Sequence, residues 1–216
     1  MIRIVVVDDD ALVRTGLDLI LGAAPDFEVV GQACDGAEAL EVVERLRPDV
    51  VLMDIRMPVM DGVAATAALV AREAAPKIIV LTTFDSDDLV VRALRAGAAG
   101  FLLKDTPPSK MIEAIRAVVA GETALSPSVV ASVVAMAVQT AGGDRSGRAL
   151  ARLAELTERE REVAVAIGRG RSNAEIAGEL YMSVATVKAY VTRIFDKLGV
   201  ENRVQVAMIV HDAGLV

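Results

Sequence analysis

The sequence predicts an α/β fold, a five-stranded doubly wound parallel sheet, followed by a small all-α domain. Within residues 1–121 five β-branched or apolar runs alternate with five helical patterns. Such alternation is typical of parallel strands, which need a crossover between them. From Leu156 onward only helical patterns occur. The charge changes as well, because residues 1–140 contain 12 Lys and Arg against 20 Asp and Glu, whereas residues 141–216 contain 11 against 10.

An acidic loop separates the first strand from the first helix. Ile2–Val7 is a β-branched run that predicts a strand, and apolar residues at helical spacing predict a helix over Ala11–Leu21. The four other strands are predicted at Phe27–Ala33, Val50–Met53, Lys77–Leu81 and Ala99–Leu103. The four other helices are predicted at Ala37–Leu46, Gly62–Arg72, Asp87–Ala96 and Pro107–Ala120. We expect Thr106 to be the N-cap of the last one and Pro107 to occupy its first position.

The alternation stops after Gly121. Ser126–Gln139 is an apolar helical pattern that must pack on the first domain, on the second domain or on another copy of the chain. Residues 142–147 are rich in glycine and predict a flexible linker. We therefore expect a first domain at residues 1–121, a linker at 122–154 and a second domain at 155–216.

Composition excludes several classes of protein. Apolar residues make up 54% of the chain, but no apolar run approaches about 18 residues, so we expect no membrane span. The chain enters its first strand at Ile2 without the segments of a signal peptide, which indicates a cytoplasmic protein. Cys34 and His211 are the only cysteine and the only histidine. An internal disulfide and a multi-Cys metal site are thereby excluded, and histidine-based acid–base chemistry is disfavoured.

Polar side chains follow the predicted strands at their carboxyl ends. They are Asp8, Asp9 and Asp10 after the first strand, Asp54 after the third, Thr82 and Thr83 after the fourth, and Lys104 after the fifth. In a doubly wound sheet these ends lie side by side. Clustered carboxylates repel one another, and Mg²⁺ prefers a few carboxylates together with water and phosphate oxygens. A lone Asp54 would more simply cap the backbone at a strand end, but the whole set predicts a magnesium site.

Short motifs around these strand ends occur in a characteristic order. They are Val7-Asp8-Asp9, Met53-Asp54, Met57-Pro58, Asp61-Gly62, Leu81-Thr82 and Lys104. With this set, residues 1–121 resemble the receiver domain of two-component response regulators, which has a flavodoxin-like fold. The resemblance implies that Asp54 is the phosphoacceptor. It also implies that Mg²⁺ is bound by Asp54, directly by Asp9, largely through water by Asp8, and by the backbone carbonyl of Arg56.

The same resemblance assigns roles to three more residues. Thr82 would be the hydroxyl that follows the phosphoryl group, Lys104 would pair with that group, and Phe101 would be the switch aromatic. The chemistry agrees, because a carboxylate attacks phosphorus once charge on the transferring group is neutralised, as Mg²⁺ and Lys104 would do. A phosphoryl group adds about two negative charges, enough to reorder a hydroxyl and a loop. Asp10 is acidic where relatives often are not, and we assign it no ligand role.

The helix starts of the second domain carry N-cap residues. Thr157 and Glu160 form a capping-box pattern, and Ser172 and Ser183 precede the next two helices. Helices are predicted at Glu158–Ile167, Asn173–Leu180, Val184–Leu198 and Arg203–Asp212. Because only residues 181–183 separate the second of these from the third, the two form a helix-turn-helix, whose second helix can lie in the DNA major groove.

That second helix has an apolar side and a polar side. The side chains expected to face the core are Val184, Val187, Val191, Ile194 and Leu198. Those expected to face outward, toward DNA, are Lys188, Ala189, Thr192 and Arg193. Ser183 and Thr186 lie at the helix N-terminus, where they can present donors to phosphate. A helical protein-interaction bundle would produce the same bare pattern.

Residues 155–213 also carry the motifs of a known DNA-binding family. They are Leu156-Thr157-Glu158-Arg159-Glu160, Ser172-Asn173-x-Glu175-Ile176-Ala177, Thr186-Val187-Lys188 and Lys197-Leu198-Gly199-Val200. The region resembles the LuxR-type domain, although Arg161 stands where that family usually has an apolar residue. The whole chain is thus similar to the NarL/FixJ class of response regulators. This likeness implies a homodimer on DNA, with the last helix offering Val204, Ala207 and Val210, some of which must instead pack on their own domain.

The likeness implies a phosphorylation-gated transcription regulator. A sensor histidine kinase would phosphorylate Asp54, and release of the second domain or dimer formation would then permit binding to promoter DNA. We expect no dedicated enzyme beyond a receiver that promotes its own magnesium-dependent phosphorylation and dephosphorylation. A phosphohydrolase is disfavoured because Asp54-Ile55-Arg56 lacks a second acid two residues on. DNA binding regulated without phosphorylation is disfavoured by the complete set of pocket residues.

Overall fold

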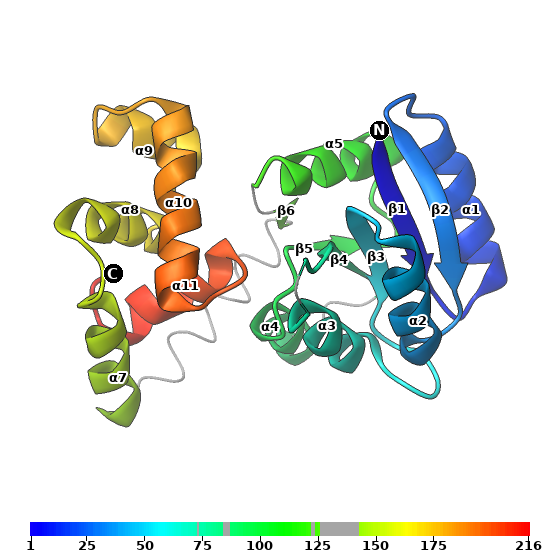
Figure 1. Cartoon of the computed structure of the whole chain (residues 1–216), viewed down its shortest axis with the longest axis horizontal. Helices are drawn as coiled ribbons and strands as arrows, with labels where there is room; N and C mark the ends of the chain where they lie inside the picture. Colours follow the sequence, from blue (N-terminus) through cyan, green and yellow to red (C-terminus); the bar gives the residue numbers. More distant parts are fainter. Residues whose placement is uncertain (73, 84–86, 122–123, 126–142) are drawn as a thin grey trace. The chain divides into compact units, whose positions relative to one another are not determined.

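The computed structural model describes residues 1–72, 74–83, 87–121, 124–125 and 143–216. The chain divides into two compact units, Met1–Val130 and Ala131–Val216 (Figure 1). The apolar pattern at Ser126–Gln139 lies outside the described residues. No helix among the described residues is both long enough and apolar enough to span a bilayer.

The strands of the first unit form one parallel sheet with the order β2-β1-β3-β4-β5-β6. Their bounds are β1 Ile2–Val7, β2 Phe27–Ala33, β3 Val50–Asp54, β4 Lys77–Thr82, β5 Gly100–Leu103 and β6 Ala124–Leu125. The five predicted strands and the doubly wound order are confirmed. The short β6 pairs with β5 beyond residue 121, where we expected the domain to end. Two residues are too few to show a strand periodicity in the sequence.

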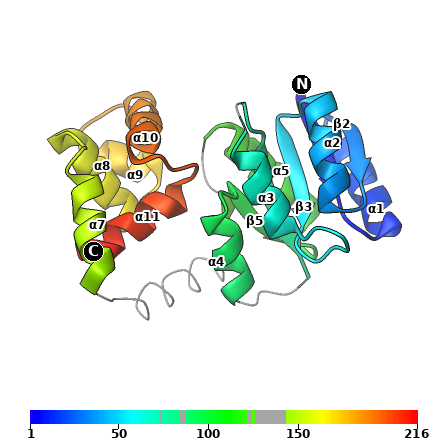
Figure 2. The ribbon, with the colours of Figure 1, turned by 60° about the horizontal axis from the view of Figure 1, so that its bottom comes forward.

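Helices cover both faces of this sheet. Their bounds are α1 Ala11–Gly22, α2 Gly36–Leu46, α3 Gly62–Val70, α4 Asp87–Arg95 and α5 Pro108–Val119. Leu17 and Leu21 of α1 and Met111 and Ile115 of α5 are buried in one cluster with side chains of β1, β3, β4 and β5. The other face of the sheet carries α2, α3 and α4 (Figures 1 and 2).

The start of α5 differs from the prediction. Pro107, not Thr106, is the N-cap residue, it makes no side-chain capping bond, and Pro108 rather than Pro107 begins the helix. The reason is the second proline: the residue before a proline is disfavoured in the helical region. Pro107 accordingly stays extended, with φ −53° and ψ 139°.

The second unit is all-helical. Its described helices are α7 Gly143–Leu153, α8 Glu158–Gly168, α9 Asn173–Glu179, α10 Val184–Leu198 and α11 Arg203–Asp212. The four helices predicted after Leu156 are confirmed. Thr157 and Glu160 form the expected capping box, and Ser172 and Ser183 are the expected N-caps.

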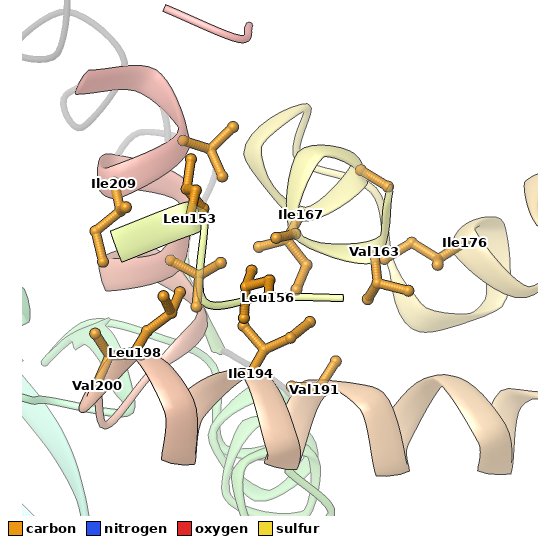
Figure 3. Close-up of a cluster of buried hydrophobic side chains, with 14 of the residues drawn as sticks. Leu153, Leu156, Val163, Ile167, Ile176, Val191, Ile194, Leu198, Val200 and Ile209 are labelled. Atoms are coloured by element: carbon orange, nitrogen blue, oxygen red, sulfur yellow. The ribbon is translucent and has the colours of Figure 1, made fainter. Parts of the chain in front are cut away.

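The prediction of a flexible linker at residues 142–147 is wrong for Gly143–Gly147, which lie in α7. The helix is anchored further along, where Ala149 and Leu153 are buried in the core of the second unit. Leu153 lies near Ile209 of α11 in that core (Figure 3). The core therefore begins before residue 155, where we expected the domain to start.

One side chain of α10 is oriented differently from the prediction. Val187, Val191, Ile194 and Leu198 are buried as expected, but Val184 is 42% exposed. Val184 is the first residue of the helix, directly after the Ser183 cap. A side chain at the first position of a helix points back past the helix N-terminus. It therefore does not reach the core, whereas the side chains of the following turns do.

Candidate functional site

Two carboxylates and one ammonium group meet at the carboxyl ends of β1, β3 and β5. Lys104 Nζ lies 2.6 Å from Asp8 Oδ2 and 3.3 Å from Asp54 Oδ2. Asp8 is fully buried and Asp54 nearly so. Asp9 is exposed, but one of its carboxylate oxygens lies within 4.8 Å of oxygens of Asp8 and Asp54. The structure thus brings together four residues that are up to 96 positions apart, as the strand-end argument predicts. We call these four residues the acidic pocket.

The backbone of the sheet sets the positions of these groups. Met53 is paired with Val7, so Asp8 and Asp54 leave neighbouring strands at the same level. The Lys104 backbone N–H donates to the Thr82 carbonyl at 2.8 Å, which keeps Lys104 beside the end of β4. Thr82 is itself buried, whereas Thr83 is exposed. Parallel pairing therefore turns distant residues into one site.

The surroundings of the acidic pocket shift the pKa values of Asp54 and Lys104. Burial raises the pKa of Asp54 above its ordinary value, although the nearby Lys104 charge acts in the opposite direction. Burial alone would lower the pKa of Lys104, but its contacts with Asp8 and Asp54 outweigh this effect and raise that pKa. The contacts therefore favour the charged form of Lys104, and additional positive charge near Asp54 would favour its carboxylate form.

The donor set fits a hard divalent cation. Asp8 Oδ2 is buried and has no hydrogen-bond partner with regular geometry among the described residues, although it faces Lys104. Asp8, Asp9 and Asp54 offer only oxygen ligands, as Mg²⁺ and Ca²⁺ prefer. Arg56 lies in the exposed loop after β3, two residues beyond Asp54. These residues are consistent with the predicted magnesium site.

Two residues near Asp8 hold its loop in place. The Asp10 side chain accepts a hydrogen bond from the Leu12 N–H at 2.8 Å and is the N-cap of α1. Arg14 Nη1 donates to the Asp8 carbonyl at 2.6 Å. Sequence analysis missed Arg14. The spacing of side chains on a helix face does not point to it, because its acceptor is a backbone carbonyl six residues earlier in the chain.

The loop after Asp54 depends on Gly62, the first residue of α3. The Gly62 N–H donates to the Ile55 carbonyl at 2.9 Å. A Cβ atom at this position would overlap the Asp54 carbonyl oxygen. Asp61 precedes it as N-cap, accepting from the Ala64 N–H at 2.7 Å. Within the same loop Val59 has φ 63°, a strained conformation for a β-branched residue.

Phe101 is fully buried on β5, paired with Val80 of β4. Phe101 therefore lies on the strand that ends just before Lys104, next to the strand that ends at Thr82, and its partner on the other side is Leu125 of β6. In the described state the ring points into the protein and leaves no aromatic surface at this position.

The second candidate site is the outward side of α10. Ala189, Thr192 and Arg193 are exposed and Lys188 is half-buried. The Thr192 hydroxyl donates to the Lys188 carbonyl at 3.2 Å, and the Arg193 guanidinium lies 5.8 Å from the Tyr190 ring centroid. At the helix start both predicted donors are exposed; Ser183 Oγ lies 2.8 Å from Thr186 Oγ1 and accepts from the Thr186 N–H at 3.0 Å.

The predicted dimer residues of α11 are used inside the domain. Val204 and Val210 are buried, and Ala207 packs against the core of the second unit. The reason is that α11 contacts α7, α8 and α10 (Figures 1 and 2). These three side chains are therefore not a free apolar surface in the described state.

Two family models match the chain. The model described as "Response regulator receiver domain" matches residues 4–116, and the model described as "Bacterial regulatory proteins, luxR family" matches residues 154–210. The first covers the unit with the acidic pocket and the second covers α8 to α11. Both matches agree with the resemblances found in the sequence.

Relatives extend over the full chain. The transcriptional regulatory protein LiaR of Bacillus subtilis is 40% identical over 100% of both chains. The probable transcriptional regulatory protein NarL of Mycobacterium tuberculosis is 39% identical over 94% of this chain and 90% of its own. Among solved structures, the response regulator ChrA of a heme-sensing two-component system is 34% identical, with a TM-score of 0.54 and coverage of 100% and 98%. The chain belongs to the response regulators that combine a receiver domain with a LuxR-type DNA-binding domain.

Proposed function

We propose that the chain is a phosphorylation-dependent transcription regulator in which Asp54 accepts the phosphoryl group. The observation that carries this proposal is the contact of the Lys104 ammonium with the buried carboxylates of Asp8 and Asp54. A structural ion pair needs one carboxylate for one ammonium. A second buried carboxylate and an exposed third are better explained by a site for cations and a phosphoryl group.

The transfer needs one nucleophile and several positive charges. An oxygen of Asp54 would attack the phosphorus of a phosphohistidine on a sensor histidine kinase. The new O–P bond forms as the P–N bond breaks, and the electron pair of that bond remains with the imidazole. Asp8, Asp9, Asp54 and the Arg56 carbonyl would hold Mg²⁺, which supplies positive charge at the phosphoryl oxygens. Lys104 supplies the second charge from the chain itself.

The same residues would convert phosphorylation into a change of shape. Lys104 now contacts Asp8 and Asp54, and a phosphoryl group on Asp54 would offer it stronger acceptors. The Thr82 hydroxyl would follow to the phosphoryl oxygens, and Phe101 on the adjacent strand would repack. The chain would thereby shift between two receiver surfaces, and hydrolysis of the Asp54 phosphate would restore the first.

The output would be binding to promoter DNA as a homodimer. Lys188, Ala189, Thr192 and Arg193 would face the major groove, and Ser183 and Thr186 would contact backbone phosphate. Since Val204, Ala207 and Val210 pack internally, α11 could contribute to the dimer only through its remaining surface or after repacking. A role at promoters would place the chain in the cytoplasm.

Incubation with Mg²⁺ and acetyl phosphate, followed by intact-mass analysis, tests the phosphoacceptor. We expect one phosphoryl addition that is lost in Asp54→Ala and without Mg²⁺. Asp10→Ala is the matched control, because Asp10 caps α1 and is not a pocket residue; it should still be labelled. Undiminished labelling of folded Asp54→Ala would show that another residue is the acceptor.

A further inference from the structure

The C-terminal end of α10 meets the ends of α7 and α8 in a set of polar contacts. We call this set the three-helix junction; it consists of the donors Arg152, Arg161 and Lys197 and the acceptors Leu198, Leu153 and Glu160. Each helix contributes to two of its three contacts. The junction lies at the opposite end of α10 from the turn of the helix-turn-helix.

Two arginines of the junction cap helix C-termini. Arg152 of α7 donates to the carbonyl of Leu198, the last residue of α10. Arg161 of α8 donates through Nη2 to the carbonyl of Leu153, the last residue of α7, at 3.1 Å. The last carbonyls of a helix have no partner within the helix, and a cation there also interacts favourably with the helix dipole. The two bonds therefore fasten α10 to α7 and α7 to α8.

The third contact holds α10 to α8 directly. Lys197 Nζ donates to Glu160 Oε2 at 2.6 Å, and Glu160 is buried. Apolar packing also stabilises the three-helix junction, because Leu153, Leu198 and Ile209 belong to one buried cluster (Figure 3). The end of α10 is thus fixed by α7 as well as by the helices that the LuxR-family model covers.

Helix α7 lies outside the part of the chain that the LuxR-family model covers. That model matches residues 154–210, whereas α7 ends at Leu153. Arg161 of α8, within the matched residues, bonds the last carbonyl of α7. The junction therefore joins α7 to the helices of the matched domain.

We propose that α7 is a fifth helix of the DNA-binding unit and that Arg152 and Arg161 are positioning residues for DNA recognition. The inference rests on the proposed function of α10 as the reading helix. With 15 residues, α10 is about 22 Å long, so a tilt of about 5° at the junction moves its other end by about 2 Å. Such a shift exceeds what a hydrogen bond to a base edge tolerates. Phosphate contacts made by flexible side chains tolerate it better.

The test compares two kinds of DNA in the full-length chain. A duplex selected by the wild-type chain from a random pool serves as the specific site, and a duplex of scrambled sequence serves as the non-specific one. We expect Arg152→Ala to raise the Kd for the specific duplex by about three- to tenfold. The Kd for the scrambled duplex should change no more in Arg152→Ala than it does in Arg148→Ala. Arg148→Ala removes the same charge from the same helix and leaves the bond to Leu198 in place. Arg152→Lys, which can still donate to that carbonyl, should recover most of the specific affinity.

Arg161→Leu gives a second test, because it replaces the guanidinium group with an apolar side chain and removes the cap of α7. This variant should also have a lower affinity for the specific duplex. The measurement is made at a temperature at which circular dichroism shows that all variants are folded. The inference would be overturned if Arg152→Ala lost affinity equally for both duplexes, or if its Kd values matched those of Arg148→Ala. Full specific affinity in Arg161→Leu would also overturn it. Failure of the wild-type chain to select any duplex would instead contradict the proposed function itself.

Discussion

Asp54 lies among residues that each restrict what its carboxylate can do. Burial raises its pKa, Lys104 offers it an ion pair, and Asp8 repels it. Arg14 holds the Asp8 carbonyl and keeps the acidic loop in place. The charged form of this carboxylate is therefore disfavoured by burial and by Asp8, and favoured by the Lys104 ammonium.

Gly62 controls the position of Asp54 through its lack of a side chain. We predict that Gly62→Ala slows phosphorylation by acetyl phosphate by about tenfold to 100-fold, because the new methyl group overlaps the Asp54 carbonyl oxygen and must displace it. Intact-mass time courses measure the rate. Gly16→Ala is the control, since a Cβ atom there meets nothing within 4 Å. Wild-type rates in Gly62→Ala would show that the backbone of Asp54 does not need this close approach.

A divalent cation in the acidic pocket would compete with Lys104 for the carboxylates of Asp8 and Asp54. We predict that Lys104→Gln binds Mg²⁺ more tightly than the wild type, because Asp8 and Asp54 lose the ammonium that now neutralises them. The rise in Tm between Mg²⁺-free and Mg²⁺-containing buffer should therefore be larger in the variant, since binding to the folded state stabilises it. Lys110→Gln, an exposed change on α5, should respond as the wild type does. An equal or smaller rise in Lys104→Gln would argue against competition at one site.

Some positions of side chains could be predicted from the sequence and others could not, for physical reasons. The pocket residues could be placed from the sequence because strand ends in a parallel sheet converge. Arg14 was missed because a long side chain that bonds a backbone carbonyl leaves no pattern in the sequence. Val184 was placed in the core by its spacing, but periodicity does not show where the first turn leaves the core.

At the scale of elements, the ion pair between α8 and α10 makes stability depend on pH. The contact with Lys197 lowers the pKa of Glu160 in the folded protein, although burial opposes this effect. A carboxyl group with a lowered folded-state pKa stabilises the protein above its unfolded-state pKa, and loses that effect as the pH falls through the folded-state value. We predict that Glu160→Gln lowers the free energy of unfolding by about 1 kcal/mol at pH 7 and by less in acid. Urea unfolding across this pH range measures it, and a difference that grows in acid would contradict the assignment.

The proposed contact of α10 with DNA can be tested at Lys188, which is half-buried. We predict that Lys188→Ala weakens DNA binding and reduces the slope of log Kd against log salt by about one ion if the contact is to phosphate. Lys110→Ala removes a positive charge from the first unit and should leave this slope unchanged. Fluorescence anisotropy over a series of salt concentrations measures both variants. A wild-type affinity and slope in Lys188→Ala would mean that α10 does not contact DNA in this way.

Elements were predictable where periodicity and caps agree. The helices α8 to α11 follow clear N-cap residues, and their starts are correct to the residue. The start of α5 was placed one residue early because a second proline keeps Pro107 extended. Helix α7 was predicted as a linker because Gly142, Gly143 and Gly147 lie before and within its first turns, whereas the helix is held by the buried Ala149 and Leu153. Tertiary packing of this kind overrides local propensity.

In the complete chain, the two units differ in charge and in the kind of site that each carries. The first carries the excess of acidic residues and the buried pocket, and the second carries a nearly balanced charge and the helix-turn-helix. In the proposed function, a phosphoryl group on the first unit would bias DNA binding by the second, which requires two states of the chain that bind DNA differently. The resemblance of each domain to its family could be found in the sequence, whereas the size of such a coupling leaves no pattern of residues.

The most direct test of this coupling is the affinity of the full-length chain for a selected duplex, with and without acetyl phosphate and Mg²⁺. A coupling of the usual size predicts about 5- to 150-fold tighter binding after phosphorylation. Asp54→Ala should show no such increase while keeping the basal affinity of the wild type. An unchanged Kd in a sample that intact-mass analysis shows to be phosphorylated would contradict the central claim that the phosphoryl group on Asp54 controls DNA binding.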